Sequence, residues 1–253
     1  MRLIIADAHV GQRQGDADEM AALVLRAADS GVGEIVYLGD SFQYLIGMSK
    51  FWTAGIDKVM LAWDRVRSDG VRIVLLEGNR DFFLDEPELA GRVDWVGRQF
   101  EFKAGPLTYR TVHGDRVNLR DFQYIFWSTV SKSLPARLWA RLLPRSVAVG
   151  IVTHMEARLA ETNRKFRYRT PVHNLRRAAD RAWAEGVDIL MWGHFHTFWQ
   201  CREGSKLAMV VPAWLETRCS VLVQPDGIWT WVGVDLRSAG SEGFPVRTEE
   251  TAT

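Results

Sequence analysis

Residue types that commonly bind metal ions recur at five places along this chain. They are Asp7 and His9 in DAH, Asp40 in GD, Asn79 in GNRD, His113 in HGD, and His194 and His196 in GHFH. Carboxylate, amide and imidazole donors of this kind suit Mn, Fe, Zn or Ni. Seven such side chains are too many for one ion and about right for two ions that share a carboxylate. Two ions roughly 3.5–4 Å apart form the usual clamp for in-line displacement at phosphorus.

Each of these motifs follows a short apolar run. The runs end at Ile5, Leu38, Leu76, Val112 and Trp192. Short apolar runs bounded by Gly or Asp predict buried strands, and open α/β sheets place their ligands at the carboxyl ends of strands. Residues two apart leave a strand on the same face. We therefore expect the members of the DAH and GHFH pairs to point the same way into one crevice.

The elements that must position these residues alternate along the chain. Helical periodicity is clear over 16–29, 57–69 and 174–185, and strands are predicted over 207–211, 220–223 and 228–234. This pattern predicts an α/β fold with a layered β-sandwich core flanked by helices. We expect a single domain over 1–237, with a polar, disordered tail over 238–253.

The connection between the HGD motif and the strand at 189 is far longer than an ordinary one. It predicts helices over 122–130, 134–143 and 147–166, so a helical lid is inserted at about 120–172. From Lys132 to Arg181 there are 12 Lys and Arg against 3 Asp and Glu. This excess favours an anionic partner such as a diphosphate, an anionic membrane surface or nucleic acid, and the alternative is a solvated helical face.

The segment 134–143 has an apolar face of leucines and a basic face, with Trp139 among them. Two interpretations remain open. A basic amphipathic helix with an aromatic residue can lie on an anionic membrane surface. It can also dock on the sheet with its arginines in water. Basic residues further along, Arg164 and Lys165 among them, are expected to hold a diphosphate or to lie against anionic lipid.

Chemical roles follow from the side-chain types. Asp40 is the better bridge because each carboxylate oxygen can bind one cation, whereas the neutral amide of Asn79 caps only one. The guanidinium of Arg80 matches phosphate geometry and is expected to neutralise charge on a phosphoryl group. Asp81 is expected to orient a metal-binding histidine. His154 and His173 lack this context and are predicted to be surface or packing residues.

Composition narrows the class of protein. A chain of 253 residues that is 47% hydrophobic can bury a full core. Its two cysteines, Cys201 and Cys219, have no CxxC spacing, so a reduced cytosolic protein is expected rather than a disulfide framework. No signal peptide is visible, and no apolar stretch approaches the ~20 residues of a membrane span.

Taken together, the five motifs resemble those of the calcineurin-like metallophosphoesterases, over residues 1 to about 235. Many members have a His after the Asn, where this chain has Arg80. GNRDF and the long insertion after HGD are similar to the UDP-2,3-diacylglucosamine hydrolases of bacterial lipid A synthesis. Asp121 and Tyr124 fall where that family has an Asp and a Tyr, and they are expected to bind substrate.

The resemblance implies how two divalent ions, most commonly Mn²⁺, are bound. One ion would be held by Asp7, His9, Asp40 and His196, and the other by Asp40, Asn79, His113 and His194. With Arg80, the residues Asp40, Asn79 and His113 would form the reacting centre. The family hydrolyses the diphosphate of an anionic, lipid-linked nucleotide sugar, releasing UMP and 2,3-diacylglucosamine 1-phosphate.

This resemblance also implies a cytoplasmic protein that can associate peripherally with the cytoplasmic face of the inner membrane, with no nucleic-acid partner. Two departures bear on the substrate. Leu45 stands where the family has a Trp, and the family's Leu-Gly-Asp-Trp segment is Val-Pro-Ala-Trp over 211–214. The alternatives are a metallophosphoesterase that acts on another phosphodiester or nucleotide diphosphate, and a metal-binding scaffold without catalysis.

Overall fold

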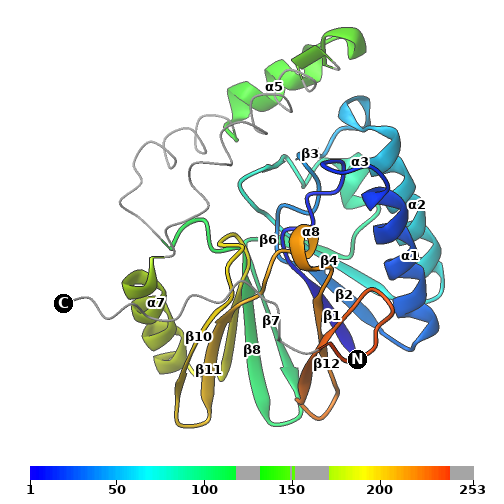
Figure 1. Ribbon diagram of the computed structural model, residues 1–253. Coiled ribbons are helices and arrows are strands. Elements are labelled where there is room, and N and C mark those ends of the chain that lie inside the picture. The colour runs from blue at the N-terminus through cyan, green and yellow to red at the C-terminus, as the bar shows by residue number, and fades with distance from the viewer. Residues whose placement is uncertain (118–131, 149, 152–170, 240–253) are drawn as a thin grey trace.

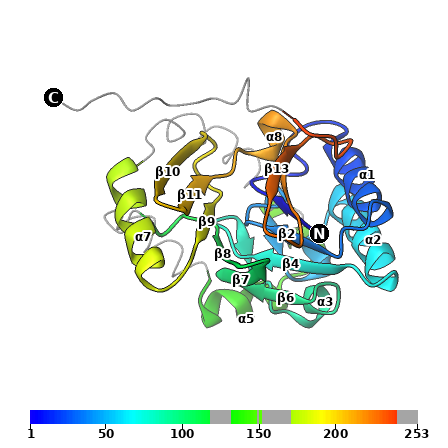
Figure 2. The ribbon, with the colours of Figure 1, turned by 90° about the horizontal axis from the view of Figure 1, so that it is seen from below.

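The computed structural model describes residues 1–117, 132–148, 150–151 and 171–239. In this part of the chain two β-sheets lie face to face, and helices cover the outer face of each (Figure 1). Figure 2 shows the same layers from below, with α1 and α2 on one side and α7 on the other. The layers confirm the α/β class and the predicted sandwich core flanked by helices.

The first sheet has six strands in the order β13-β12-β1-β2-β4-β6. Its central strands β1, β2, β4 and β6 are parallel, whereas β12 and β13 are antiparallel additions at one edge. The strands are β1 (Arg2–Ile5), β2 (Glu34–Tyr37), β4 (Arg72–Leu76), β6 (Trp95–Gly97), β12 (Ser220–Val223) and β13 (Trp229–Val232).

The second sheet has five strands in the order β10-β11-β9-β8-β7. Here β8, β9 and β11 are parallel, and β7 and β10 are antiparallel strands at the two edges. The strands are β7 (Gln99–Ala104), β8 (Leu107–Val112), β9 (Ile189–Trp192), β10 (Trp199–Glu203) and β11 (Lys206–Val210). Neither β7 nor β10 is predicted from the sequence, because charged residues interrupt their apolar pattern.

Side chains along the central strands point alternately to the two faces of each sheet, and this explains the layers. In β1, Leu3 and Ile5 pack under helices α1 (Asp16–Asp29) and α2 (Ala54–Ser68), whereas Ile4 points into the core between the sheets. In β9, Leu190 and Trp192 pack under helix α7 (Val172–Ala184), and Met191 faces the other sheet. Strands buried on both faces therefore appear in the sequence as unbroken apolar runs.

The predicted helices that fall within the described residues are present, two of them with earlier starts. Helix α1 has the predicted bounds. Helix α2 begins three residues before the predicted position 57, because the Thr53 side chain caps it by accepting from the backbone N of Ile56 at 3.3 Å. Helix α7 begins at Val172 instead of 174. The helix expected over 134–143 is α5 (Leu134–Leu142), capped by Ser133.

Short elements complete the fold around the site. They are strands β3 (Leu45–Ile46) and β5 (Asp81–Phe82), which pair with each other, a 3-10 helix (Ser49–Phe51), and helices α3 (Pro87–Ala90) and α8 (Trp214–Thr217). No helix in the described ranges is long and apolar enough to cross a membrane.

The helix predicted over 122–130, and most of that over 147–166, lie outside the described residues. The prediction that the disordered tail begins at residue 238 is wrong at its first two residues. Ser238 bridges to Val232, and the backbone N of Ala239 donates to the Trp231 carbonyl at 2.8 Å. Residues 240–253 of that tail are outside the described part of the chain.

Candidate metal centre

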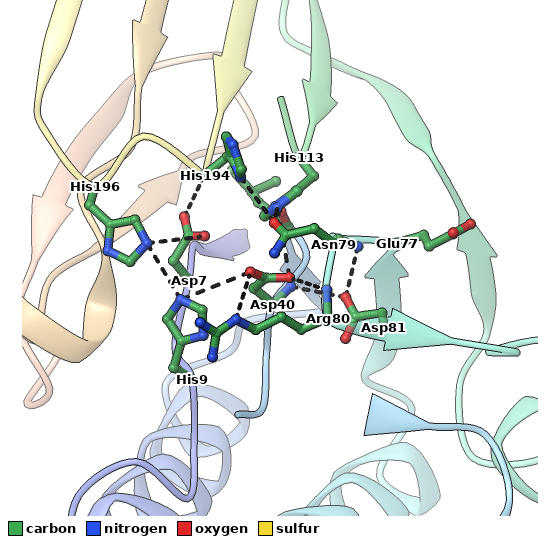
Figure 3. Close-up of polar contacts among 12 residues, drawn as sticks. Asp7, His9, Asp40, Glu77, Asn79, Arg80, Asp81, His113, His194 and His196 are labelled. Atoms are coloured by element: carbon green, nitrogen blue, oxygen red, sulfur yellow. Dashed lines mark hydrogen bonds and ion pairs between the residues drawn. The ribbon is translucent and has the colours of Figure 1, made fainter. Parts of the chain in front are cut away.

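The seven predicted ligands lie together at one end of the sandwich, where the two sheets meet (Figure 3). The first sheet supplies those that follow β1, β2 and β4, and the second sheet supplies those that follow β8 and β9. In that order they are Asp7 and His9, Asp40, Asn79, His113, and His194 and His196. The prediction that each motif follows a buried strand is confirmed for β1, β2, β4 and β9, whereas β8 is only partly buried.

Five of these seven residues have a left-handed backbone: φ is 46° at Asp7, 44° at His9, 49° at Asp40, 69° at His194 and 56° at His196. Such a conformation costs a non-glycine residue on the order of 1–3 kcal/mol and is concentrated at functional sites. The DAH and GHFH pairs were expected to point the same way because residues two apart in a strand share a face, and this reason is wrong. The chain has left the strand, and left-handed turns aim both members of each pair into the site.

One group of ligand atoms comes from Asp7, His9 and His196. The Nε2 atoms of the two histidines are 3.4 Å apart, and Nε2 of His196 is 3.9 Å from Oδ1 of Asp7. The two rings are stacked, with centroids 5.3 Å apart. One ligand atom from each of the three residues lies within 4.8 Å of the others. This spacing suits a single ion bound among the three side chains.

A second group surrounds Asn79. Its Oδ1 atom is 3.0 Å from Nε2 of His113 and 3.0 Å from Nδ1 of His194. Nε2 of His113 is also 3.7 Å from Oδ1 of Asp40. Both histidines therefore direct a ring nitrogen toward the same small volume that the amide oxygen faces, as a second ion requires.

The carboxylate of Asp40 lies between the two groups. Oδ1 faces His113 in the second group, and Oδ2 is 4.0 Å from Nε2 of His9 in the first group. Asp7 is also close to both, because one of its oxygens lies within 4.8 Å of ligand atoms of Asp40 and His113. Asp40 remains the better bridge because its two oxygens face different groups.

Two histidines are held neutral. Burial lowers the pKa of His9 well below its usual value, and Arg80 and His196 lower it further against the opposing charge of Asp40. Burial and the neighbouring His113 lower the pKa of His194 to about 4. A neutral imidazole presents the lone pair that a metal ligand needs.

His113 has the opposite shift. Burial alone would lower its pKa, but the charges of Asp40 and Asp7 outweigh burial and raise the pKa to about 9. Burial likewise favours protonated Asp40, yet His113 and His9 outweigh it and hold the pKa of that carboxyl well below its usual range. Asp40 and His113 thus form a buried charge pair in the metal-free protein, and an ion would replace the proton on His113.

The site fits divalent metal ions on its own observations. Oδ1 of Asp7 is buried and has no hydrogen-bond partner among the described residues, which is costly unless a cation binds there. Burial also raises the pKa of Asp7, with His196 opposing the shift. Nitrogen and oxygen donors without a thiolate suit the metals that the sequence indicated.

Close packing explains the glycines of the motifs. Gly39, before Asp40, has φ +87°, and a Cβ atom there would lie 2.6 Å from Nδ1 of His113. At Gly193, before His194, a Cβ atom would lie 2.7 Å from Oδ2 of Asp7. Any larger residue at these two positions would displace a ligand side chain.

Asp81 does not orient a histidine, so that prediction is wrong. Its Oδ2 atom accepts hydrogen bonds from the backbone N of Gly78 at 2.7 Å and of Asp40 at 2.9 Å. It therefore joins the loops that carry Asn79 and Asp40. Burial and the charge of Asp40 raise the pKa of Asp81 to about 7.

Two other groups, neither of them predicted from the sequence, support the histidines. The Leu38 carbonyl lies 2.7 Å from Nδ1 of His113, which fixes the ring and leaves Nε2 to face the site. Oε1 of Glu216, in α8, is 3.6 Å from Nδ1 of His196. A backbone carbonyl carries no sequence signal, and Glu216 is far from every motif.

Arg80 is buried beside the predicted bridge. Nε lies 3.8 Å from Oδ2 of Asp40, and Nη1 donates to the carbonyl and Oε1 of Gln43 at 3.2 Å and 3.1 Å. Only 3% of the side chain is exposed. The structure thus places Arg80 at the floor of the site, and its contact with a substrate phosphate stays a prediction.

Helix α5 presents the opposite face to that expected of a docked helix with its arginines in water. Arg137 and Arg141 point inward to the buried Glu86, and Arg137 also contacts Asp85 at 2.9 Å. The leucines point outward. Part of the positive excess of the insertion is therefore used in ion pairs with the core, which the charge count could not reveal.

The remaining predicted residues lie on α7 or outside the described part of the chain. His173 is exposed on α7, as predicted for a surface histidine. The expected substrate-binding residues and the second spare histidine lie outside the described residues: Asp121, Tyr124, Arg164, Lys165 and His154.

No protein-family model and no curated protein matches this chain. Solved structures do match it at low identity. A dimetal phosphatase from Danio rerio is 16% identical, with 92% of this chain and 96% of that chain covered and a TM-score of 0.49. An archaeal phosphodiesterase is 10% identical (91% and 98% covered, TM-score 0.47), and Vps29 from Chaetomium thermophilum is 14% identical (91% and 87%, 0.45). The chemistry is inferred from the side chains described above.

Proposed function

We propose that this protein is a dinuclear metal-dependent phosphoesterase. The observation that carries the proposal is the Asp40 carboxylate, whose two oxygens face two separate groups of ligands, 3.7 Å from His113 and 4.0 Å from His9. A structural role alone does not explain seven ligand-type side chains at this one point. Two divalent ions would supply an activated water and neutralise the charge of a phosphate.

The chain's own residues complete the chemistry. His9 and His194 are neutral and ready to bind ions. The guanidinium of Arg80, next to the predicted bridge, would stabilise negative charge that develops on the phosphoryl oxygens. Asp81 accepts hydrogen bonds from both loops and so holds Asp40 and Asn79 in place relative to each other.

A small activated substrate tests this activity directly. Wild-type protein reconstituted with Mn²⁺ should hydrolyse bis(p-nitrophenyl) phosphate, and chelation should abolish the reaction. His113→Ala should remove activity, whereas His173→Ala, an exposed histidine on α7, should not. Absence of turnover in protein shown to be folded and loaded with metal would contradict the proposal.

Within this class, we infer that the substrate is UDP-2,3-diacylglucosamine, which would be cleaved to UMP and 2,3-diacylglucosamine 1-phosphate. The GNRDF motif and the position of the insertion support this inference by resemblance. Exposed apolar side chains on α5 support a lipid partner: Leu134 is 72%, Leu138 56%, Trp139 59% and Leu142 83% exposed. A cytoplasmic protein at the inner membrane would present this face to the lipid surface.

The lipid substrate requires its own assay. UMP release should be measured from acylated and from deacylated UDP-glucosamine, with Mn²⁺ added to both. The acylated compound should give the higher kcat/KM, because remote binding of the chains would position the diphosphate over the metal centre. Equal values would favour the alternative, a phosphoesterase that acts on another nucleotide diphosphate or phosphodiester.

A further inference from the structure

A groove of about 360 Å³ adjoins the metal centre on the outer face of the second sheet. It begins at His113 and Gly114 and extends over β8 and β9 to α7, where Ala178 and Arg181 line it. Small-molecule sites commonly have about this volume or more. His113, which belongs to the second group of metal ligands, also lines the groove.

The floor and the rim of the groove differ in chemistry. Val112, Leu190 and Trp192 form an apolar floor. The rim is basic, with Arg98, Arg110, Arg116, Lys132 and Arg181 against the acidic Glu77 and Asp115. A ligand that fits must therefore combine an organic body with negative charge.

Three of the basic side chains on the rim are paired with acidic partners. Arg98 contacts Glu77 at 3.4 Å. Arg110 contacts Glu101 at 2.6 Å and Glu185 at 2.5 Å. Nζ of Lys132 contacts Glu77 at 2.5 Å and donates to the Gly78 carbonyl at 2.7 Å. These pairs shape the walls of the groove and leave little charge for a ligand.

Arg116 and Arg181 differ from these residues. Both are exposed, and neither has an acidic partner in the part of the chain that the structure describes. Nε of Arg181 donates only to the Arg177 carbonyl, at 3.3 Å. A guanidinium without a carboxylate partner offers a planar fork of donors that matches phosphate.

We propose that this groove binds a phosphomonoester attached to an organic body, and that it thereby holds one of the two products of the reaction. The inference rests on the proposed function and names a second part of the same site. The apolar floor would contact the body, and Arg116 and Arg181 would bind the phosphate. Both halves of a cleaved nucleotide-sugar diphosphate carry such a group, so the two must be compared.

Equilibrium binding to the Mn²⁺-loaded protein shows which of the two product halves the groove binds. The probes are UMP, glucosamine 1-phosphate and inorganic phosphate, measured by titration calorimetry. One of the organic probes should bind at least about tenfold more tightly than inorganic phosphate, because its organic body would in addition bury apolar surface on the floor of the groove. The double variant Arg116→Ala/Arg181→Ala should weaken binding of that probe at least about tenfold, since a hydrogen bond to a charged group contributes roughly that factor or more.

Arg176→Ala is the matched control, because it removes the same charge from an exposed position on α7 that does not line the groove. It should keep the affinity for that probe. Arg116→Ala alone should weaken this affinity, and circular dichroism should show that each variant is folded. Three results would overturn the proposal: no preference for an organic probe in the wild type, undiminished affinity in the double variant, or an equal loss of affinity in Arg176→Ala.

These binding measurements do not depend on turnover. Hydrolysis of bis(p-nitrophenyl) phosphate by the same preparations therefore separates the two proposals. Turnover without a preference for either organic probe would overturn the proposal of a product-binding groove and leave the proposed phosphoesterase activity supported. A preference without turnover would contradict the phosphoesterase and leave the groove as a binding site.

Discussion

Arg80 contacts Asp40 through both its backbone and its side chain. The backbone N donates to Oδ1 at 2.9 Å, and Nε lies 3.8 Å from Oδ2. Both oxygens of the predicted bridge are thus held by the residue that was expected to act on substrate. Arg80 can orient the bridge as well as stabilise charge on a phosphoryl group, and the two roles predict different results.

If Arg80 acts on the phosphoryl group, Arg80→Ala should lower kcat by about 10²–10³-fold and leave metal content unchanged, because the guanidinium is not a ligand. Arg80→Lys should restore only part of the rate, since a point charge lacks the bidentate fork. Turnover and Mn²⁺ content should be measured on the same samples. Unchanged turnover would exclude Arg80 from the mechanism, and a parallel loss of metal would assign it to positioning Asp40.

Removing the Asp81 carboxylate should affect both loops that it joins, those that carry Asp40 and Asn79. Asp81→Ala would leave two buried N–H groups, those of Gly78 and Asp40, without their acceptor, at a cost of about 1–3 kcal/mol each. The free energy of unfolding should fall and Mn²⁺ affinity should weaken. Asp81→Asn keeps an acceptor oxygen and should retain most of both. Equal damage in the two variants would contradict the role of this acceptor.

The raised pKa of Asp81 adds a dependence on pH. Because it lies at about 7 in the folded protein, above the usual 3.8, the unfolded chain ionises first. This group's contribution to stability is present below about pH 4 and is lost as pH rises toward 7. Urea unfolding of metal-free protein should show wild type losing stability relative to Asp81→Asn across that range. A constant difference would contradict the shift.

Glu86 should anchor α5. Its buried carboxylate pairs with Arg137 and Arg141, and Glu86→Gln would leave both guanidinium groups without their main counter-charge. The loss from a partly buried pair should reach about 1–3 kcal/mol. Asp18→Asn, which breaks an exposed pair with Lys58, is the control and should cost under about 1 kcal/mol. Amide hydrogen exchange over 132–148 should rise only in the Glu86 variant, and equal exchange would contradict the anchor.

Removing metal should destabilise the fold. The metal-free site contains the buried carboxylates of Asp7 and Asp40 and left-handed ligand residues. Free Mn²⁺ at about a hundred times its Kd adds about 2.7 kcal/mol, which for a chain of this size raises Tm by roughly 5–10 °C. Thermal unfolding with and without chelator measures this. A Tm that is the same in both conditions would mean that no ion binds the native state selectively.

Local sequence patterns predicted much of the fold and the ligand set. Unbroken apolar runs located β1, β4 and β9 because these strands are buried on both faces. Turn residues after each run located the ligands, and periodicity located α1 at its actual bounds. These features depend on neighbours in sequence, which is why they could be predicted.

Features that depend on distant contacts could not be predicted. The pairing of β8 with β9 joins segments separated by the long insertion. Glu216 approaches His196 only because α8 folds back against the site. In α5 the pattern showed that two faces differ, but not that the buried Glu86 would draw the arginines inward. The role of Asp81 could not be predicted either, because its backbone partners have no sequence signature.

The most direct test of a dinuclear centre bridged by Asp40 is the metal content of pure protein after reconstitution with Mn²⁺ and removal of free ion. Wild type and the control His173→Ala should contain about two ions per chain. Asp40→Asn, a change that the left-handed backbone at this position tolerates, should lower occupancy at both positions and abolish turnover. One ion or none in the wild type, or full occupancy in Asp40→Asn, would contradict this account.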